Sequence, residues 1–133
     1  MDRLKEQLAI AAKALASFRR LAELPSRTEE QRDAAIKRFE YTLETIWKAA
    51  QRYLLDRESR EEGSPRGCIR ACREVGILSA GQAEQALKMA DDRNLTSHTY
   101  NEDLAHEVEG RLKDHAEICA LWLAGMEARS KAS

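Results

Sequence analysis

The chain has 133 residues, 43% of them hydrophobic and 34% charged, with six glycines and two prolines. This composition is typical of one helical globular domain and excludes a disordered or fibrous chain. The formal net charge is −1, so no bulk field draws the chain to nucleic acid or to an anionic membrane. A nucleic-acid contact would need a local cluster of Arg and Lys.

The sequence also indicates a compartment. No apolar run approaches the ~18 residues that a membrane span needs. The first twenty residues, MDRLKEQLAIAAKALASFRR, combine early charges with an amphipathic period, which argues against a signal peptide. Three cysteines is an odd number, which favours reduced thiols over disulfides. We therefore expect a soluble, cytoplasmic protein with no membrane contact.

Apolar residues at helical spacing predict a first helix over residues 2–23 and a second over about 28–56. Between them, Pro25 prevents the first helix from continuing. The second helix has two possible capping boxes, Ser26 with Glu29 and Thr28 with Gln31, and both stay open. Its apolar stripe is the most regular in the chain and consists of Ile36, Phe39, Leu43, Ile46, Ala50 and Tyr53.

A charged loop without periodicity, DRESREEGSPRG, follows the second helix. Ser64 as a cap and Pro65 at the first helical position predict a short helix that ends at Gly76. Ser79 and Gln82 form another capping box. It predicts a further helix, which leads directly into a polar stretch of the sequence.

The last part of the chain predicts one more long helix. Its cap is either Thr99 with Glu102 or Asn101 alone. Residues after about 126 are expected to be frayed or disordered. The inward face of this helix is formed by Leu104, Val108, Leu112, Cys119 and Trp122.

No segment has strand periodicity, and no internal repeat is visible. Four long helices and one short one, joined by mostly short connections, predict an all-α fold: an up-and-down four-helix bundle with one short extra helix. We expect one helical-bundle domain over residues 1–126 and a tail over 127–133. Tyr41 and Trp47 widen the apolar face of the second helix. This width favours a homodimer that packs through helix faces, and a broad core face is the alternative.

The stretch DDRNLTSHTYNED, residues 91–103, is almost wholly polar. As a continuous helix it would place Arg93 and Tyr100 within about 20° of each other, with Asn94 and His98 on an adjacent face. Arg93 and His98 would reach one phosphate only if the helix kinks or ends between them. The sequence permits such an end, because three nearby hydroxyl residues compete for backbone hydrogen bonds.

These side chains suit phosphodiester cleavage without a metal ion. A neutral His98 can accept the proton of a ribose 2′-hydroxyl. Arg93 can hold phosphate oxygens and stabilise charge, and Asn94 can orient either group. The alternative is a polar helix end in which Arg93 pairs with Asp91 or Asp92. Residue types by themselves favour that alternative.

Other candidate groups are weaker. Cys68 and Cys72 lie four residues apart, but no second Cys or His pair has zinc-site spacing, so structural thiols are expected and no metal site. His106 and His115 are expected to be satisfied histidines of the last helix. The sequence has no Gly-rich phosphate loop, and no Gly-Ser followed by Asp-x-Asp. It is therefore not expected to be a nucleotidyltransferase catalytic domain, and no cofactor is expected.

Three stretches together resemble a known family. RDAAIKRFEYTLETIWKAAQRYL (32–54), GSPRGCIRACREVGIL (63–78) and MADDRNLTSHTYNE (89–102) are similar, in order and spacing, to the nucleotidyltransferase substrate-binding proteins of the HEPN superfamily. The resemblance covers roughly residues 5–125. Its third stretch resembles the superfamily's Arg-x4-His motif, here followed by the tyrosine at position 100.

The resemblance implies a dimer that forms a complex with a minimal nucleotidyltransferase encoded by a neighbouring gene, and it leaves two functions open. In the first, the chain is the toxin of a toxin–antitoxin pair: a metal-independent endoribonuclease that cuts RNA with Arg93 and His98, supported by Asn94. The partner would silence it by transferring AMP to Tyr100. In the alternative, the chain is a non-catalytic substrate-binding subunit of a two-component nucleotidyltransferase. Whether it is an enzyme stays open. The residues expected to line the site or contact the partner are Arg38, Glu40 and Tyr41.

Overall fold

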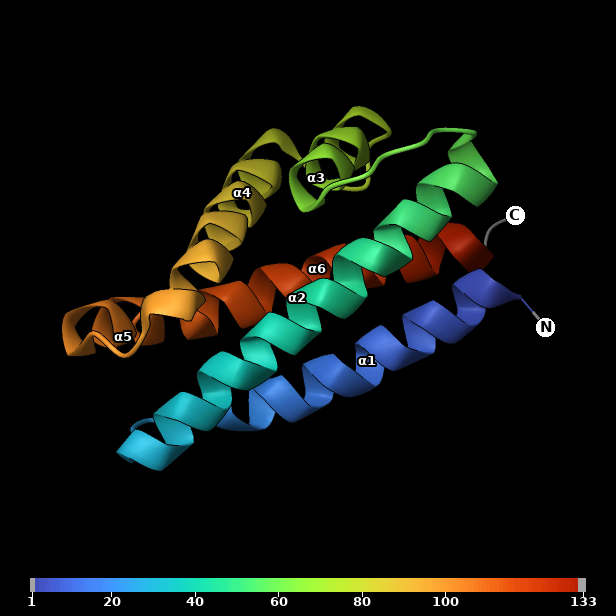
Figure 1. The fold of residues 1–133 in the computed structure, drawn as a ribbon. Helices are drawn as coiled ribbons and strands as arrows, with labels where there is room; N and C mark the ends of the chain where they lie inside the picture. Colours follow the sequence, from blue (N-terminus) through green and yellow to red (C-terminus); the bar gives the residue numbers. More distant parts are fainter. Residues whose placement is uncertain (1, 132–133) are drawn as a thin grey trace.

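The computed structural model describes residues 2–131, and every regular element within them is helical (Figure 1). The predicted all-α class is therefore confirmed. A 3-10 turn at Thr96–His98 is the shortest element. None of the helices in this range is long and apolar enough to cross a membrane. The α-helices are α1 (Arg3–Ala22), α2 (Glu29–Glu58), α3 (Pro65–Glu74), α4 (Ala80–Leu95), α5 (Glu102–Glu109) and α6 (Leu112–Lys131).

The long helices form the predicted bundle. Helices α1, α2 and α6 lie side by side along the length of the molecule and pack on one another (Figure 1). Helix α4 packs on α6 and, more lightly, on α2, while the short α3 contacts both α2 and α4. Helix α4 is thus held against the bundle. The predicted homodimer stays a prediction.

Helix α2 supplies the centre of the hydrophobic core. Its six predicted stripe residues are all buried, and Phe39 packs against Phe18 of α1 with ring centroids 5.9 Å apart. Each large apolar side chain buried in this way contributes about 1.5–3 kcal/mol. Trp47 is only half-buried and donates its indole N–H to Glu44. Tyr41 is 59% exposed, so this chain does not cover the full apolar width of α2.

The last part of the chain differs from prediction in two ways. The single long helix is divided into α5 and α6 at Gly110 and Arg111. Glycine is a weak helix former, and the Arg111 amide bonds the carbonyl of Val108, three residues back, instead of the one four residues back. Asn101 alone caps α5. Helix α6 continues to Lys131, so the prediction of a frayed or disordered tail is wrong for residues 127–131. The two final residues lie outside the described range.

The structure also decides between the two capping boxes of α2. The Thr28 hydroxyl accepts a hydrogen bond from the Gln31 amide at 3.1 Å, and the Gln31 side chain accepts one from the Thr28 amide at 2.9 Å. Ser26 is exposed and is not the cap.

We expect Thr28→Ala to lower the free energy of unfolding by about 1 kcal/mol, because the Gln31 amide at the start of α2 loses the hydroxyl that accepts its hydrogen bond. Urea unfolding measures the change. Ser26→Ala is the matched control and is expected to change stability by no more than a few tenths of a kcal/mol. Equal losses in the two variants would contradict the assignment of the cap.

Candidate functional site

Helix α4 ends between Arg93 and His98, as the sequence permits. The hydroxyl of Thr96 donates to the Arg93 carbonyl at 2.7 Å, and Ser97 and Thr99 make the same contact with the carbonyls three residues before them. These bonds favour a 3-10 turn over continued α-helix. The assumption of a continuous helix, which placed Arg93 and Tyr100 on one face, therefore does not hold beyond Leu95.

Arg93 is held by helix α2. Its Nη1 lies 3.3 Å from Oε2 of Glu40 and donates to the Thr96 hydroxyl at 3.1 Å. That hydroxyl also lies 2.6 Å from the Glu40 carboxylate. Neither predicted partner of Arg93 is correct. Asp91 pairs with Arg66, and Asp92 pairs with Arg111 and His115. Glu40 thus gains a definite role, which is to fix the guanidinium of Arg93.

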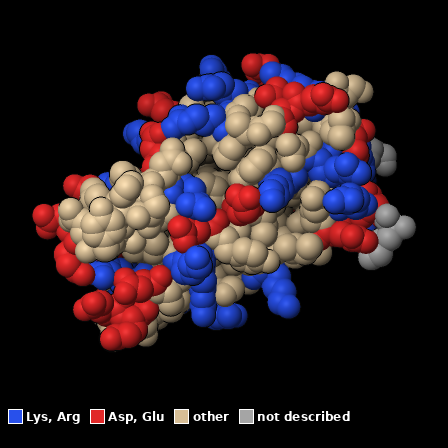
Figure 2. All heavy atoms as spheres, in the orientation of Figure 1, with Lys and Arg blue, Asp and Glu red and all other residues tan. Residues whose placement is uncertain are grey.

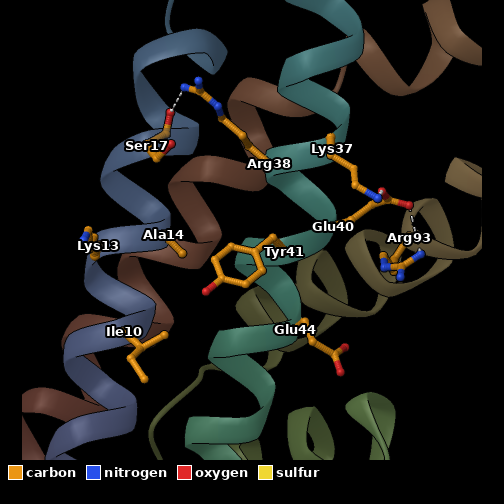
Figure 3. Close-up of a pocket in the computed structure, with 10 residues that line it drawn as sticks. All are labelled: Ile10, Lys13, Ala14, Ser17, Lys37, Arg38, Glu40, Tyr41, Glu44 and Arg93. Atoms are coloured by element: carbon orange, nitrogen blue, oxygen red, sulfur yellow. Dashed lines mark hydrogen bonds and ion pairs between the residues drawn. The ribbon is translucent and has the colours of Figure 1, made fainter.

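A groove of about 790 Å³ opens over the outer face of α2, between α1 and the end of α4 (Figure 3). It brings together four of the predicted residues: Arg38, Glu40, Tyr41 and Arg93. In Figure 3, Tyr41 points toward α1, while Glu40 and Arg93 meet on the opposite side of α2. Arg38 donates to the backbone carbonyl of Ser17 at 2.9 Å. Residues that the sequence had not singled out also line the groove: Ile10, Lys13, Ala14, Ser17, Lys37 and Glu44.

The other predicted site residues lie outside this groove. Asn94 and His98 are exposed. The His98 ring meets the Tyr100 ring edge-on, with centroids 6.2 Å apart. Tyr100 is 84% exposed and lines a smaller hollow beside Arg32. Within one chain, the motif is therefore divided between the α2 groove and a separate exposed pair of rings.

A buried polar cluster next to Arg93 was missed by the sequence reading. Asp92 is 4% exposed and accepts two hydrogen bonds from Arg111, at 2.7 and 2.8 Å, and lies 2.6 Å from Nε2 of His115. The His115 ring stacks on Phe39 with centroids 5.1 Å apart. His115 is thus a satisfied core histidine, as expected. The position of Asp92 could have indicated this cluster. It lies three positions after the buried Met89, which places a charged residue on the inward face of α4.

The protonation of this cluster follows from its burial. Burial lowers the pKa of His115 below its ordinary value, against the opposing influence of Asp92. Burial acts to raise the pKa of Asp92, but the hydrogen bonds from Arg111 and His115 outweigh it and lower the pKa. At neutral pH we therefore assign a neutral ring that donates its Nε2–H to an ionised carboxylate.

We expect acid to weaken the fold through His115. At a pH above 6.5, the ordinary pKa of His115, the ring is neutral in both the folded and the unfolded chain. Below that pH the unfolded chain binds a proton that the folded chain resists, so the free energy of unfolding falls. Unfolding followed from about pH 7.5 to about pH 5.5 tests this. His115→Asn should lose less stability over that range than wild type. Equal pH dependence in wild type and His115→Asn would contradict the assignment.

The three cysteines lie in the core and not in a site. Burial raises the pKa of Cys68 to about 12 and that of Cys72 to about 11, and Trp122 donates its indole N–H to Cys72 at 3.3 Å. Cys119 is buried as well, with its pKa raised to about 12. Among the described residues, no group of three or more His, Cys, Asp or Glu side chains is placed to hold a metal ion.

The fold and the groove define a small α-helical bundle with a hollow over its central helix. The family described as "Nucleotidyltransferase substrate binding protein like" matches residues 6–128, and the chain belongs to this family. The predicted membership of the nucleotidyltransferase substrate-binding family is therefore confirmed. No curated protein is significantly similar to the chain.

The solved structures that are similar to the chain include the following two. A protein from Thermus thermophilus is 50% identical, with a TM-score of 0.85; the match covers 87% of this chain and 98% of the other. A protein from Haemophilus influenzae has a TM-score of 0.73 at 20% identity, with 90% and 98% covered, and is described as having the fold of a substrate binding domain of a nucleotidyltransferase. At 20% identity, this structural similarity shows the fold alone. The family's description names substrate binding, which favours the subunit hypothesis over the ribonuclease.

Proposed function

We propose that this chain is the substrate-binding subunit of a two-component nucleotidyltransferase. It holds the acceptor molecule in the groove over α2, while a separate minimal nucleotidyltransferase, encoded by a neighbouring gene, binds the nucleotide and performs the transfer. Family membership over residues 6–128 is the observation that carries this proposal. The groove supports it, since Arg38, Glu40 and Tyr41 were expected to line a site and do line one hollow.

In this proposal the chain contributes to the reaction by position. A bound acceptor is held in one orientation beside the partner, which removes much of the entropic cost of bringing two reactants together. Tyr41 offers an exposed ring against which the acceptor packs. The guanidinium groups of Arg38 and Arg93 are each fixed by a contact within the chain, so they are prepared for binding without further ordering.

A reconstituted transfer assay tests the proposal. The partner is incubated with ATP labelled at the α-phosphate and with the small molecules of a deproteinised cell extract, with and without this chain. We expect labelled small molecules only when both proteins are present, and about tenfold less label with Tyr41→Ala. Leu55→Ala is the control, because Leu55 is also exposed on α2 but lies outside this groove. The molar mass of the preparation in solution tests the predicted homodimer.

Three outcomes would contradict this function. The first is equal labelling of small molecules by the partner without this chain. The second is label on this chain at Tyr100, and the third is RNA cleavage in EDTA by wild type and not by His98→Ala. The last two would favour the ribonuclease silenced by transfer of AMP.

A further inference from the structure

The charge of the α2 groove differs from that of the whole chain. The chain carries a net charge of −1, and Figure 2 shows basic and acidic side chains interspersed over the face that carries α1, α2 and α4. Yet the groove is lined by two acidic residues, Glu40 and Glu44, and by twice as many basic ones. A hollow with such an excess concentrates anions. The basic residues are Lys13, Lys37, Arg38 and Arg93.

Both acidic residues of the groove are already engaged. Glu40 contacts Arg93 and Thr96, and one of its oxygens lies 3.7 Å from Nζ of Lys37. Glu44 accepts the indole N–H of Trp47 and pairs with a lysine outside the groove, Lys48, at 3.1 Å. A cationic ligand would therefore have to displace these partners before it could use either carboxylate.

The basic side chains, by contrast, keep unused donors. Arg38 bonds a neutral carbonyl through one nitrogen, Nη1, so its charge is not neutralised. Lys13 is exposed and forms no ion pair within the described part of the chain. Arg93 uses only Nη1 in its contacts with Glu40 and Thr96. Guanidinium groups with free N–H donors match the geometry of phosphate oxygens.

Apolar surface lies between these donors. Tyr41 is 59% exposed and Ile10 is 49% exposed, and in Figure 3 the two side chains lie on facing sides of the groove, with Ala14 beside them. An exposed tyrosine ring favours a planar group that stacks on its face. The groove thus offers a planar apolar contact and phosphate-binding donors within one hollow.

We propose that the acceptor held in the α2 groove is a small molecule that carries a phosphate group beside a planar ring. This inference rests on the proposed function and names the class of its substrate. Arg38 and Lys13 bind the phosphate, and Tyr41 packs against the ring. A polycationic acceptor does not fit, because four basic residues would repel it.

Titration of this chain alone, followed by NMR chemical shifts, tests the inference. The probes are AMP, which has both features, adenosine, inorganic phosphate and the polycation spermidine. We expect AMP to bind about tenfold more tightly than adenosine, since adenosine lacks the charge-assisted hydrogen bonds, and spermidine to leave the groove signals unchanged. Tyr41→Ala should weaken the binding of AMP and not that of phosphate.

Variants of Arg38 provide the sharper comparison. Arg38→Gln should weaken AMP binding about tenfold, while Arg38→Lys, which keeps the charge, retains most of it. Arg20→Gln, on an exposed residue of α1 outside the groove, should match wild type. Circular dichroism confirms equal folding. If Arg38→Gln unfolds, the Arg38→Lys and Tyr41→Ala results still decide.

Several results would overturn the inference. They are equal affinity for adenosine and AMP, shifts in the groove on adding spermidine, and unchanged AMP binding in Arg38→Gln. The partner is not part of this titration. Its failure therefore leaves the transfer assay as an independent test of the proposed function.

Discussion

Phe39→Ala is expected to lower the free energy of unfolding by about 4 kcal/mol, because the side chain is fully buried and its removal leaves a cavity in the centre of the bundle. Its ring contacts Phe18 on one side and stacks on His115 on another. The loss therefore affects the packing of α1, α2 and α6 together. Denaturant unfolding measures it, with an unchanged slope as evidence that the same surface is exposed.

Tyr41→Ala is the matched control for Phe39→Ala. It removes an aromatic ring from the same helix two residues further on, where the side chain is exposed. We expect a change within about 0.5 kcal/mol. Comparable losses at both positions would mean that the ring of Tyr41 is covered in solution, as it would be in a dimer that packs through α2.

Asp92→Ala is expected to cost about 3 kcal/mol. The carboxylate is buried and receives Arg111 and His115, so its removal leaves the buried His115 ring without its partner. Breaking a buried ion pair typically costs about 3–5 kcal/mol, and the lower value applies here because Arg111 is partly exposed and regains water. Thermal or urea unfolding tests the effect.

Two variants separate the causes of the Asp92 effect. Asp91→Ala removes the neighbouring carboxylate, whose pair with Arg66 is exposed, and is expected to change stability by less than about 1 kcal/mol. Both alanines gain the same helix propensity, so that contribution cancels. Asp92→Asn retains an acceptor for His115 and is expected to lose less than Asp92→Ala. A loss at position 91 as large as at position 92 would contradict the role given to burial.

Much of the fold was predictable, because a helix that buries one face has apolar residues at helical spacing in its sequence. Helix α2 was predicted over 28–56 and spans Glu29–Glu58, since large apolar residues recur along one face. Capping residues located helix starts, but the choice between Ser26 and Thr28 depended on backbone geometry. The division of the last helix was missed for a related reason. Apolar spacing continues across Gly110, so the pattern carries no sign of the local break.

The candidate site was predictable only in part. Arg38, Glu40 and Tyr41 came from resemblance to a family, and Arg93 from its residue type within a polar stretch. The groove that unites them also needs residues of α1, such as Ile10 and Lys13. These residues lie about 30 positions away from Arg38, Glu40 and Tyr41 along the chain, so only tertiary packing brings them together. The partners of Asp92 are equally non-local, so local pairing with Arg93 was the wrong expectation.

We expect the three buried cysteine thiols of the folded chain to be unreactive toward thiol reagents at neutral pH, because the thiolate is the reactive species and burial raises the pKa of each thiol. Modification then occurs only when a helix opens. Cys68 and Cys72 belong to the short α3, and Cys119 to α6. Mass spectrometry of the labelled chain over time would therefore distinguish detachment of α3 from opening of the whole bundle. The same inertness allows a fluorophore to be placed on one engineered surface cysteine while the native ones are left in place.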